Sequence, residues 1–423
     1  MQQPEPRTAR WALTFFPIWT GQALSLLGSQ IAQFAIIWWL TQSTGSGTVL
    51  AVAALVGILP GVVLGPVAGA LVDRWNRRRV MMAADGLSAL LAALLAYLFW
   101  RGTVELWQIY AIMFARSVFG TFHFPAMQAS TSLMVPQEQL ARVAGLNQML
   151  QGAMNIVAPP LSALLLVALP LHALMAIDVV TAALAIVPML FVLIPQPPRP
   201  AETSAAGSVL QDVRAGLRYV RAWPGMLALL GMAMVINFLL GPAFSLLPLL
   251  VTRHFGGAAL ELSWLSSSWW VGILAGGVAL STWGGFRSRM LTALTALIAM
   301  GAGLLFTGLV PPQAFWAGVG ALFFAGAMNS LCNGPMFALL QAVVAPEMQG
   351  RVFTLIGSLS SLMVPIGLGV AGPLSDLLGP QLWFAVGGAA CVLMGAAGLL
   401  SPTIMGIERH ALATTPAAAE PAS

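Results

Sequence analysis

Long apolar runs separated by short polar turns occupy the chain from about residue 13 to residue 404. Each run is long enough for a helix to cross a hydrocarbon core of roughly 30 Å. We predict twelve membrane-spanning helices, and a polar, Pro-containing segment over 195–222 separates the first six from the last six. The predicted helices cover 13–40, 48–72, 80–100, 106–134, 143–168, 172–194, 225–250, 262–284, 290–310, 314–345, 351–377 and 381–404.

The two sets of six helices also repeat in sequence. Pro125 lies eleven residues before Pro136, and Pro335 lies eleven residues before Pro346. Each second proline is followed by an acid and an arginine four residues apart: Glu138 with Arg142, and Glu347 with Arg351. The segment VAPPLSALL (157–165) is echoed by VAGPLSDLL (370–378), and all three features share an offset of 209 to 213 residues. The repeat predicts two pseudo-symmetric six-helix bundles related by an axis along the membrane normal.

These patterns together predict an all-α membrane protein with twelve transmembrane helices in two bundles. Its predicted parts are a cytoplasmic N-terminus (1–12), an N-terminal bundle (13–194), a cytoplasmic linker (195–222), a C-terminal bundle (223–405) and a disordered cytoplasmic tail (406–423).

Composition strengthens this interpretation and sets the orientation. The chain is 59% apolar and 7% charged, whereas soluble domains carry about 25% charged residues. All 18 basic residues are arginines. With the N-terminus inside, fifteen of them fall in inner segments, and only Arg101 and Arg253 fall in outer loops. The positive-inside rule therefore predicts that both termini are cytoplasmic in a multi-pass protein of the inner membrane.

Several classes of function are excluded. The net charge of +5 is spread over short loops, so no basic surface is expected to bind nucleic acid. A nucleotide site of the P-loop type needs a lysine, and the chain has none. No HExxH motif, nucleophile elbow or central carboxylate pair suggests an enzyme, and Cys332 and Cys391 are expected to be buried hydrophobic residues, not metal ligands. We expect no cofactor and a monomer whose partners are the lipid bilayer, a small lipophilic substrate and protons.

A charged turn joins the second and third predicted helices and carries a recognisable motif. The stretch GPVAGALVDRWNRRRVMMAADG (65–86), with GQALSLLGSQIAQFAIIWWLTQSTGS (21–46) before it, resembles drug exporters of the major facilitator superfamily, a group that includes macrolide efflux proteins and the enterobactin exporter. The similarity is densest over residues 20–90 and thins through the second half. Five residues match the G-x-x-x-D-R-x-G-R-R signature: Gly69, Asp73, Arg74, Arg77 and Arg78.

The chain departs from the family pattern at three places. Asn76 stands where a glycine is usual, and asparagine tolerates a left-handed turn there. The equivalent loop of the second half, GGFRSR (284–289), keeps glycine and arginine but lacks the acid. In helix five, the glycines of the antiporter motif are replaced by Ala158, Ser162 and Ala163.

The resemblance implies a conformational latch at this turn. In the family, the acid at the position of Asp73 contacts the start of helix eleven, here near Gly350 and Arg351, when the cytoplasmic side is closed. A helix N-terminus stabilises a carboxylate. The candidate latch residues are Gly69, Asp73, Arg74, Arg77, Arg78, Glu347 and Arg351. The alternative is that the charged turn only fixes the topology.

Three charged residues inside predicted helices are candidates for proton coupling: Arg116, Asp178 and Asp85. Arg116 lies about 15 Å into the fourth helix at 1.5 Å per residue, and charges at such depth are retained for a partner or a function. Asp178 is its most plausible partner, either in a fixed structural pair or as an acid that exchanges protons. For Asp85 we favour pairing with the arginines of the charged turn, and a protonation role is the alternative.

Polar side chains on one face of several helices suggest a cavity wall. Gln22, Ser25, Ser29 and Gln33 share a face of the first helix, and Arg116 and His123 share one of the fourth. The resemblance implies that helices one, four, seven and ten line a central cavity, so the candidate cavity residues are Gln22, Ser25, Gln33, Arg116, His123, Asn237, Phe244, Asn329 and Asn333. The alternative is hydrogen bonding between helices, worth about 0.6 kcal/mol each. Histidine exchanges protons near neutral pH, although His123, beside Phe122 and Phe124, is more often a packed or hydrogen-bonded ring.

The resemblance implies a secondary active transporter that exports lipophilic, macrolide-like drugs by alternating access. Proton antiport is expected because the sequence offers no nucleotide site as an energy source. An exporter of siderophores or other metabolites is the alternative within the same fold. A non-transporting membrane sensor is the alternative of a different class.

Overall fold

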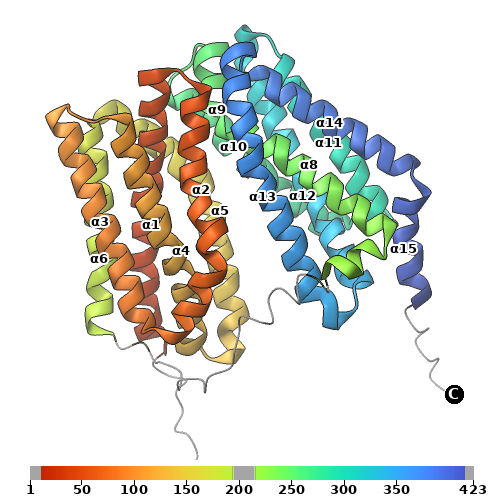
Figure 1. Cartoon of the computed structure of the whole chain (residues 1–423), viewed down its shortest axis with the longest axis horizontal. Coiled ribbons are helices and arrows are strands. Elements are labelled where there is room, and N and C mark those ends of the chain that lie inside the picture. Colours follow the sequence, from red (N-terminus) through yellow and green to blue (C-terminus); the bar gives the residue numbers. More distant parts are fainter. Residues whose placement is uncertain (1–10, 193, 195–213, 215, 415–423) are drawn as a thin grey trace, which may run out of the picture. The chain divides into compact units, whose positions relative to one another are not determined.

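The computed structural model describes residues 11–192, 194, 214 and 216–414, and the elements assigned within them are helices (Figure 1). The first half contains α1 (Trp11–Thr44), α2 (Gly47–Arg74), α3 (Arg77–Arg101), α4 (Leu106–Met134), α5 (Gln137–Ala168) and α6 (Leu171–Phe191). The second half contains α8 (Pro224–Ser245), α9 (Leu247–Leu249), a π-helical turn η1 (Leu250–His254), α10 (Ala259–Trp283), α11 (Arg289–Leu309), a 3₁₀ turn η2 (Pro312–Ala314), α12 (Phe315–Val343), α13 (Pro346–Leu378), α14 (Gln381–Leu400) and α15 (Pro402–Thr414).

Ten described helices are long and apolar enough to span a membrane. They confirm a multi-pass, all-α membrane protein. The predicted helices over 106–134 and 262–284 correspond to α4 and α10, which are not among the ten. The total of twelve spans therefore stays a prediction.

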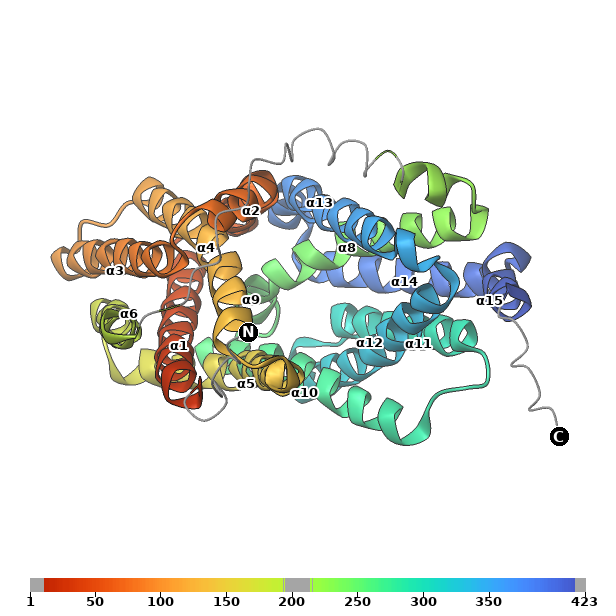
Figure 2. The same cartoon turned by 90° about the horizontal axis from the view of Figure 1, so that it is seen from below.

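The chain divides into two compact units, residues 1–201 with 257–267, and residues 202–256 with 268–423. The division passes through α10, whose first residues belong to the N-terminal unit. In that unit α1 packs against α6 and α5, and α3 packs against α6 and α4, an arrangement that can be followed in Figure 2. In the C-terminal unit α8 packs against α14 and α13, and α11 packs against α14 and α12. The third helix of each half thus lies between the fourth and the sixth.

The repeated prolines occupy matching places in the two halves. Pro125 lies inside α4 and Pro136 caps the start of α5, while Pro335 lies inside α12 and Pro346 opens α13. Proline lacks the backbone N–H that a helix interior needs but is tolerated in the first turn. The second proline of each pair therefore marks where the fifth helix of its half begins.

Asn76 corrects one detail of the charged turn. Its φ is −70° and its ψ is 106°, so it is extended, not left-handed. Its side-chain oxygen accepts a hydrogen bond from the Arg79 amide at 3.1 Å and caps α3. Asparagine is a strong N-cap residue, and this role explains it better than tolerance of a left-handed turn.

Arginines at the start of the third helix make the same contact in both units. The Arg77 guanidinium reaches the Ala129 carbonyl of α4 at 3.5 Å, and Arg289 donates to the Ala338 carbonyl of α12 at 3.2 Å. Ala129 and Ala338 are separated by the 209-residue offset of the sequence repeat. These arginines tie the start of the third helix to the last two turns of the fourth helix in each unit.

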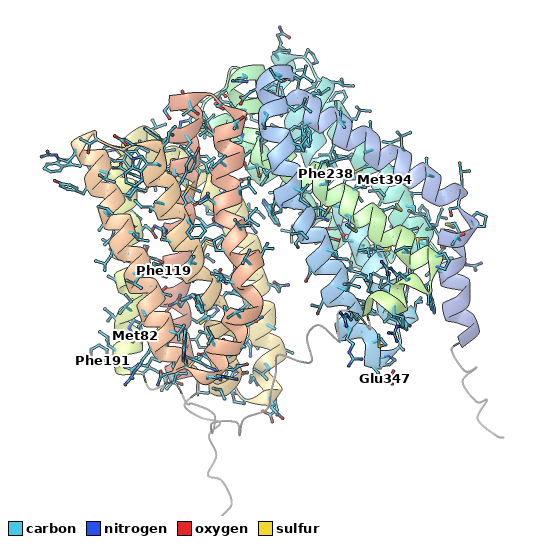
Figure 3. All side chains as sticks on the ribbon, in the orientation of Figure 1. Met82, Phe119, Phe191, Phe238, Glu347 and Met394 are labelled. Atoms are coloured by element: carbon cyan, nitrogen blue, oxygen red, sulfur yellow. The ribbon has the colours of Figure 1, made fainter. Side chains whose placement is uncertain are left out.

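Arg78 ties α3 to α6 in a similar way. Its guanidinium donates to the carbonyls of Met189 and Leu190, at 2.5 and 2.7 Å. In Figure 3, Met82 of α3 and Phe191, the last residue of α6, lie toward the same end of the N-terminal unit.

The C-terminal end of the chain differs from its predicted form. Composition predicts disorder from residue 406, but α15 is helical over Pro402–Thr414. Ile404 and Ile407 are buried in an apolar cluster with Val220 and Met226. This packing gives α15 a fixed place in the C-terminal unit. The predicted linker over 195–222 and the rest of the tail lie mainly outside the described residues.

Candidate functional site

A polar pocket of about 710 Å³ lies within the N-terminal unit. Its walls come from α1, α2, α3, α4 and α6. Five predicted site residues from the first half line it, together with both acids proposed for proton coupling: Gln22, Ser25, Gln33, Arg116, His123, Asp85 and Asp178. Residues spread over 160 positions of sequence are thus collected around one cavity.

One ion-pair cluster joins α1, α4 and α6. The Arg116 Nη1 atom lies 2.5 Å from Asp178 Oδ2, and the Ser29 hydroxyl donates to Asp178 Oδ1 at 2.9 Å. Arg116 Nη2 also donates to the Ser29 hydroxyl oxygen at 3.3 Å. Only 2% of the Asp178 side chain and 17% of the Arg116 side chain are exposed. The structure therefore contains the Arg116–Asp178 contact that the sequence predicts, with Ser29 as a third member.

A second cluster joins α1, α3 and α4. The Gln22 amide donates to Asp85 Oδ2 at 2.8 Å, and His123 Nε2 lies 3.2 Å from Asp85 Oδ1. The favoured sequence interpretation of Asp85, pairing with the arginines of the charged turn, is wrong. Asp85 lies eight residues beyond Arg77, about 12 Å along the helix, and the α4 imidazole is the charge partner within reach. His123 is accordingly half of a charge pair, not only a packed ring.

The two clusters are separated by the same number of residues on α1 and on α4. Gln22 and Ser29 are seven residues apart on α1, and Arg116 and His123 are seven residues apart on α4. Seven residues make about two helical turns, or about 10 Å, and they return to the same face. The clusters therefore lie one above the other along the pocket wall.

Gly28 allows α1 and α6 to approach closely beside the Asp178 cluster. A Cβ atom at Gly28 would lie 2.0 Å from Thr181 Oγ1 and 3.2 Å from the Asp178 Cα. A Cβ atom at Gly21, seven residues earlier, would likewise lie 3.0 Å from the Ala185 Cα. Small residues at such spacing are how membrane helices pack backbone to backbone. This contact brings Ser29 within hydrogen-bond distance of Asp178.

At the charged turn, Asp73 lies 3.4 Å from the Arg77 guanidinium within the same unit. The Asp73 side chain is 67% exposed, whereas the Arg77 side chain is 10% exposed. Gly69 has open space around it. The predicted contact of Asp73 with the start of the eleventh predicted helix stays a prediction. Glu347 and Arg351 both lie in the first two turns of α13 and are exposed.

The predicted cavity residues of the second half make contacts within their own unit and are not among the residues that line the pocket. Asn237 bonds back to the Ala233 carbonyl at 2.9 Å, and Asn333 to the Asn329 carbonyl at 3.1 Å. Phe244 packs against Trp269, with ring centroids 4.5 Å apart. Their assignment to a cavity wall therefore stays a prediction.

A family model described as Major Facilitator Superfamily matches residues 18–368. Macrolide efflux protein A of Streptococcus pyogenes is 36% identical over 382 residues, which cover 90% of this chain and 94% of that protein. This chain belongs to the major facilitator superfamily. It is therefore a membrane transporter, in agreement with the prediction that it is not an enzyme.

A further relative and a solved structure are also similar to this chain over most of its length. The multidrug efflux pump Tap of Mycolicibacterium fortuitum is 28% identical over 391 residues, covering 89% of this chain and 93% of the pump. Among solved structures, a bacterial homologue of the iron transporter ferroportin in an inward-facing state matches with a TM-score of 0.70 at 15% identity, over 95% of this chain and 99% of that one. The structural match supports the predicted major facilitator fold.

Sequence reasoning missed the partners of Asp85. It placed Gln22 and His123 on cavity faces and Asp85 at the charged turn, without connecting them. The matching seven-residue spacings on α1 and α4 are the signal that could have found the second cluster. If Arg116 of α4 lies beside Ser29 of α1, then the residues two turns away on the same helix faces, Gln22 on α1 and His123 on α4, also lie beside each other.

Proposed function

We propose that this protein exports lipophilic, macrolide-like drugs from the cytoplasm by alternating access, driven by protons moving inward. The observation that carries the proposal is the N-terminal pocket, in which two carboxylates and an arginine face a cavity of about 710 Å³. Charged groups at such depth in a membrane bundle mark pathways for substrates and ions. The names of the relatives, macrolide efflux protein A and the multidrug pump Tap, support drugs as the substrate class.

The remaining site residues receive proposed roles within this cycle. Gln22, Ser25, Gln33 and the second-half residues Asn237, Phe244, Asn329 and Asn333 would contact substrate. The charged turn and the start of α13 would form the latch. We place the protein in the inner membrane as a monomer with both termini in the cytoplasm, on the arginine distribution.

An exporter of anionic siderophores is the second candidate, and the pocket disfavours it. An anionic catecholate would need an exposed, positively charged arginine in the cavity. Arg116 is instead neutralised by Asp178 at 2.5 Å, so it has no uncompensated positive charge to offer a catecholate.

The test measures accumulation of radiolabelled erythromycin in cells with and without the protein. We expect lower accumulation in the cells that produce it, and loss of the difference when a protonophore collapses the gradient. Equal accumulation in both cell lines would contradict drug export and favour a sensor. A difference that survives the protonophore would contradict proton drive. Lower accumulation of siderophores but not of macrolides in the cells that produce the protein would favour the second candidate.

A further inference from the structure

The two carboxylates of the pocket have different kinds of partner, and this difference separates their roles. Asp178 faces Arg116, a permanent cation, and the neutral hydroxyl of Ser29. Asp85 faces His123, which can itself gain or lose a proton, and the neutral amide of Gln22.

The charge of Asp178 is fixed by its neighbour. An arginine side chain stays protonated in proteins, so protonating Asp178 would leave the Arg116 guanidinium without its counter-ion. Arg116 is 17% exposed and Asp178 only 2% exposed. An uncompensated charge at such a site is strongly unfavourable. Asp178 is therefore a poor place for a proton to bind and leave in each cycle.

Within the part of the chain that the structure describes, the contacts of Asp85 are to Gln22 and His123 and include no arginine. When the carboxylate is ionised and the imidazole neutral, the pair carries a charge of about −1; one added proton makes it neutral overall. The proton lies between two groups 3.2 Å apart, so it belongs to the pair. Gln22 donates to one carboxylate oxygen and leaves the other, 3.2 Å from the imidazole, for the exchange.

The pair is also the more accessible of the two clusters. Exposure is 11% for the Asp85 side chain and 21% for His123, against 2% for Asp178. Both residues line the pocket. A proton carried by water can therefore reach Asp85 and His123 through the cavity.

Other charged groups on the neighbouring helices lie at a distance or are already paired. Along α3 the arginines of the charged turn begin six residues away, about 9 Å, and on α4 Arg116 lies about 10 Å away. On α6 the titratable groups are Asp178, which is paired with Arg116, and His172. His172 lies thirteen residues before Ala185, the residue of α6 that packs against Gly21. On α2 they are Asp73 and Arg74 at its last turn, and α1 carries none over Trp11–Thr44.

We infer that Asp85 and His123, held by Gln22, form the proton-exchange site of this transporter, and that Arg116–Asp178 is a fixed structural pair. This inference rests on the proposed proton-driven export. One proton from water on one side of the membrane adds to the pair, the pair loses its net negative charge, and the same proton leaves to water on the other side.

The experiment uses the full chain in proteoliposomes with radiolabelled erythromycin as the probe. One assay measures transport driven by an imposed pH gradient, and the other measures exchange of labelled for unlabelled erythromycin without a gradient. We compare the wild type with Asp85→Asn, with His123→Gln and with Glu105→Gln, an exposed acid outside the pocket that serves as the matched control. Size-exclusion profiles and thermal stability check that each variant is folded.

We expect Asp85→Asn to lose the response to the pH gradient but to keep exchange, because exchange needs no proton movement. His123→Gln should keep exchange and show a gradient response that is weaker and shifted in pH. Gradient-driven transport by folded Asp85→Asn at the wild-type level would overturn the inference. So would equal loss of both activities, since that pattern means a structural role.

The neutralised double variant Arg116→Gln/Asp178→Asn tests the other half of the inference. If the pair is only structural, the double variant should keep a response to the pH gradient. If it loses that response while Asp85→Asn keeps it, the proton site is Asp178 instead. A wild type that ignores the gradient in liposomes would overturn the proposed proton drive itself, an outcome distinct from the variant patterns.

Discussion

Asp178 is the least exposed carboxylate of the pocket, and its two oxygens are occupied by Arg116 and Ser29. Replacing Arg116 with alanine leaves this carboxylate buried without a counter-ion. Removing one partner of a buried ion pair costs about 3–5 kcal/mol. We therefore expect Arg116→Ala to lower the thermal stability of the protein in detergent by more than any neutral substitution along the pocket wall.

The matched control is the double variant Arg116→Gln/Asp178→Asn, which replaces both charges with amides of similar shape. Because neither residue then carries an uncompensated charge, much of the lost stability should return, and a double-mutant cycle should show strong coupling. Additive losses from Arg116→Gln and Asp178→Asn would contradict a tight pair.

It was harder to predict which site residues contact one another than to predict which residues belong to the site. The sequence marked Arg116, Asp178, Asp85, Gln22 and His123 as unusual because polar groups inside apolar runs are costly. Which of them touch depends on the rotation of each helix about its axis and on its height in the bundle. The sequence predicts the Arg116–Asp178 pair, but it favours the arginines of the charged turn as partners of Asp85, which contacts His123 instead.

At the scale of the helix, the α1–α6 contact depends on the absence of a side chain at Gly28. A Cβ there would come within 2.0 Å of Thr181 Oγ1, 3.0 Å of Thr181 Cβ and 3.2 Å of the Asp178 Cα, so Gly28→Ala must displace the Thr181 side chain and strain the α1–α6 contact beside the Ser29–Asp178 hydrogen bond. We expect lower thermal stability. Gly145→Ala on α5 is the control, because a Cβ there meets nothing within 4 Å; with only the backbone entropy of glycine removed, it should stabilise by about 0.5–1 kcal/mol. The same sign for both substitutions would contradict the close packing.

The start of α11 is stabilised by a carboxylate from another helix, α15, whereas the start of α3 is capped by the Asn76 side chain. Glu408 of α15 accepts bonds from the Ser288 hydroxyl at 2.5 Å and from the Arg289 amide at 2.8 Å. A carboxylate at a helix N-terminus satisfies free amides and the dipole. The loop 284–289 lacks the acid of its N-terminal counterpart, and α15 brings one to this position.

We expect Glu408→Ala to destabilise the C-terminal unit by about 1–2 kcal/mol, the usual value of a lost cap. Faster proteolysis after Leu400 would accompany this loss if α15 detaches. Glu138→Ala, an exposed acid in the first turn of α5, is the control and should change stability by a few tenths of a kcal/mol. Equal effects from both substitutions would show that the cap contributes nothing beyond the dipole.

At the scale of the whole molecule, the fold was largely predictable, because each half must bury the same apolar pattern in the same way. The proline spacing predicted the repeat, and the fifth helix of each half begins at its second proline or one residue later, before the predicted starts at residues 143 and 351. The helix α15 was not predicted, because the residues after Ile407 were interpreted together with the Ala-, Pro- and Thr-rich end of the chain. Its Ile404 and Ile407 become informative only once the cluster that receives them exists.

The proposed latch is a property of the two units together, and it can be tested by the distance between them. Spin labels at Arg79→Cys and Arg287→Cys, both at exposed positions, report that distance once Cys332 and Cys391 are replaced by alanine. If Asp73 stabilises the closed cytoplasmic side through the dipole of α13, Asp73→Asn should reduce the population with the shorter distance. A contact of about 0.3–1 kcal/mol corresponds to a change of about two- to fivefold. Glu105→Gln, an acid at the opposite end of the bundle, should leave the distribution unchanged. If Asp73→Asn lowers stability but does not alter the distances, the Asp73–Arg77 contact at 3.4 Å is its whole role, and the charged turn fixes topology alone.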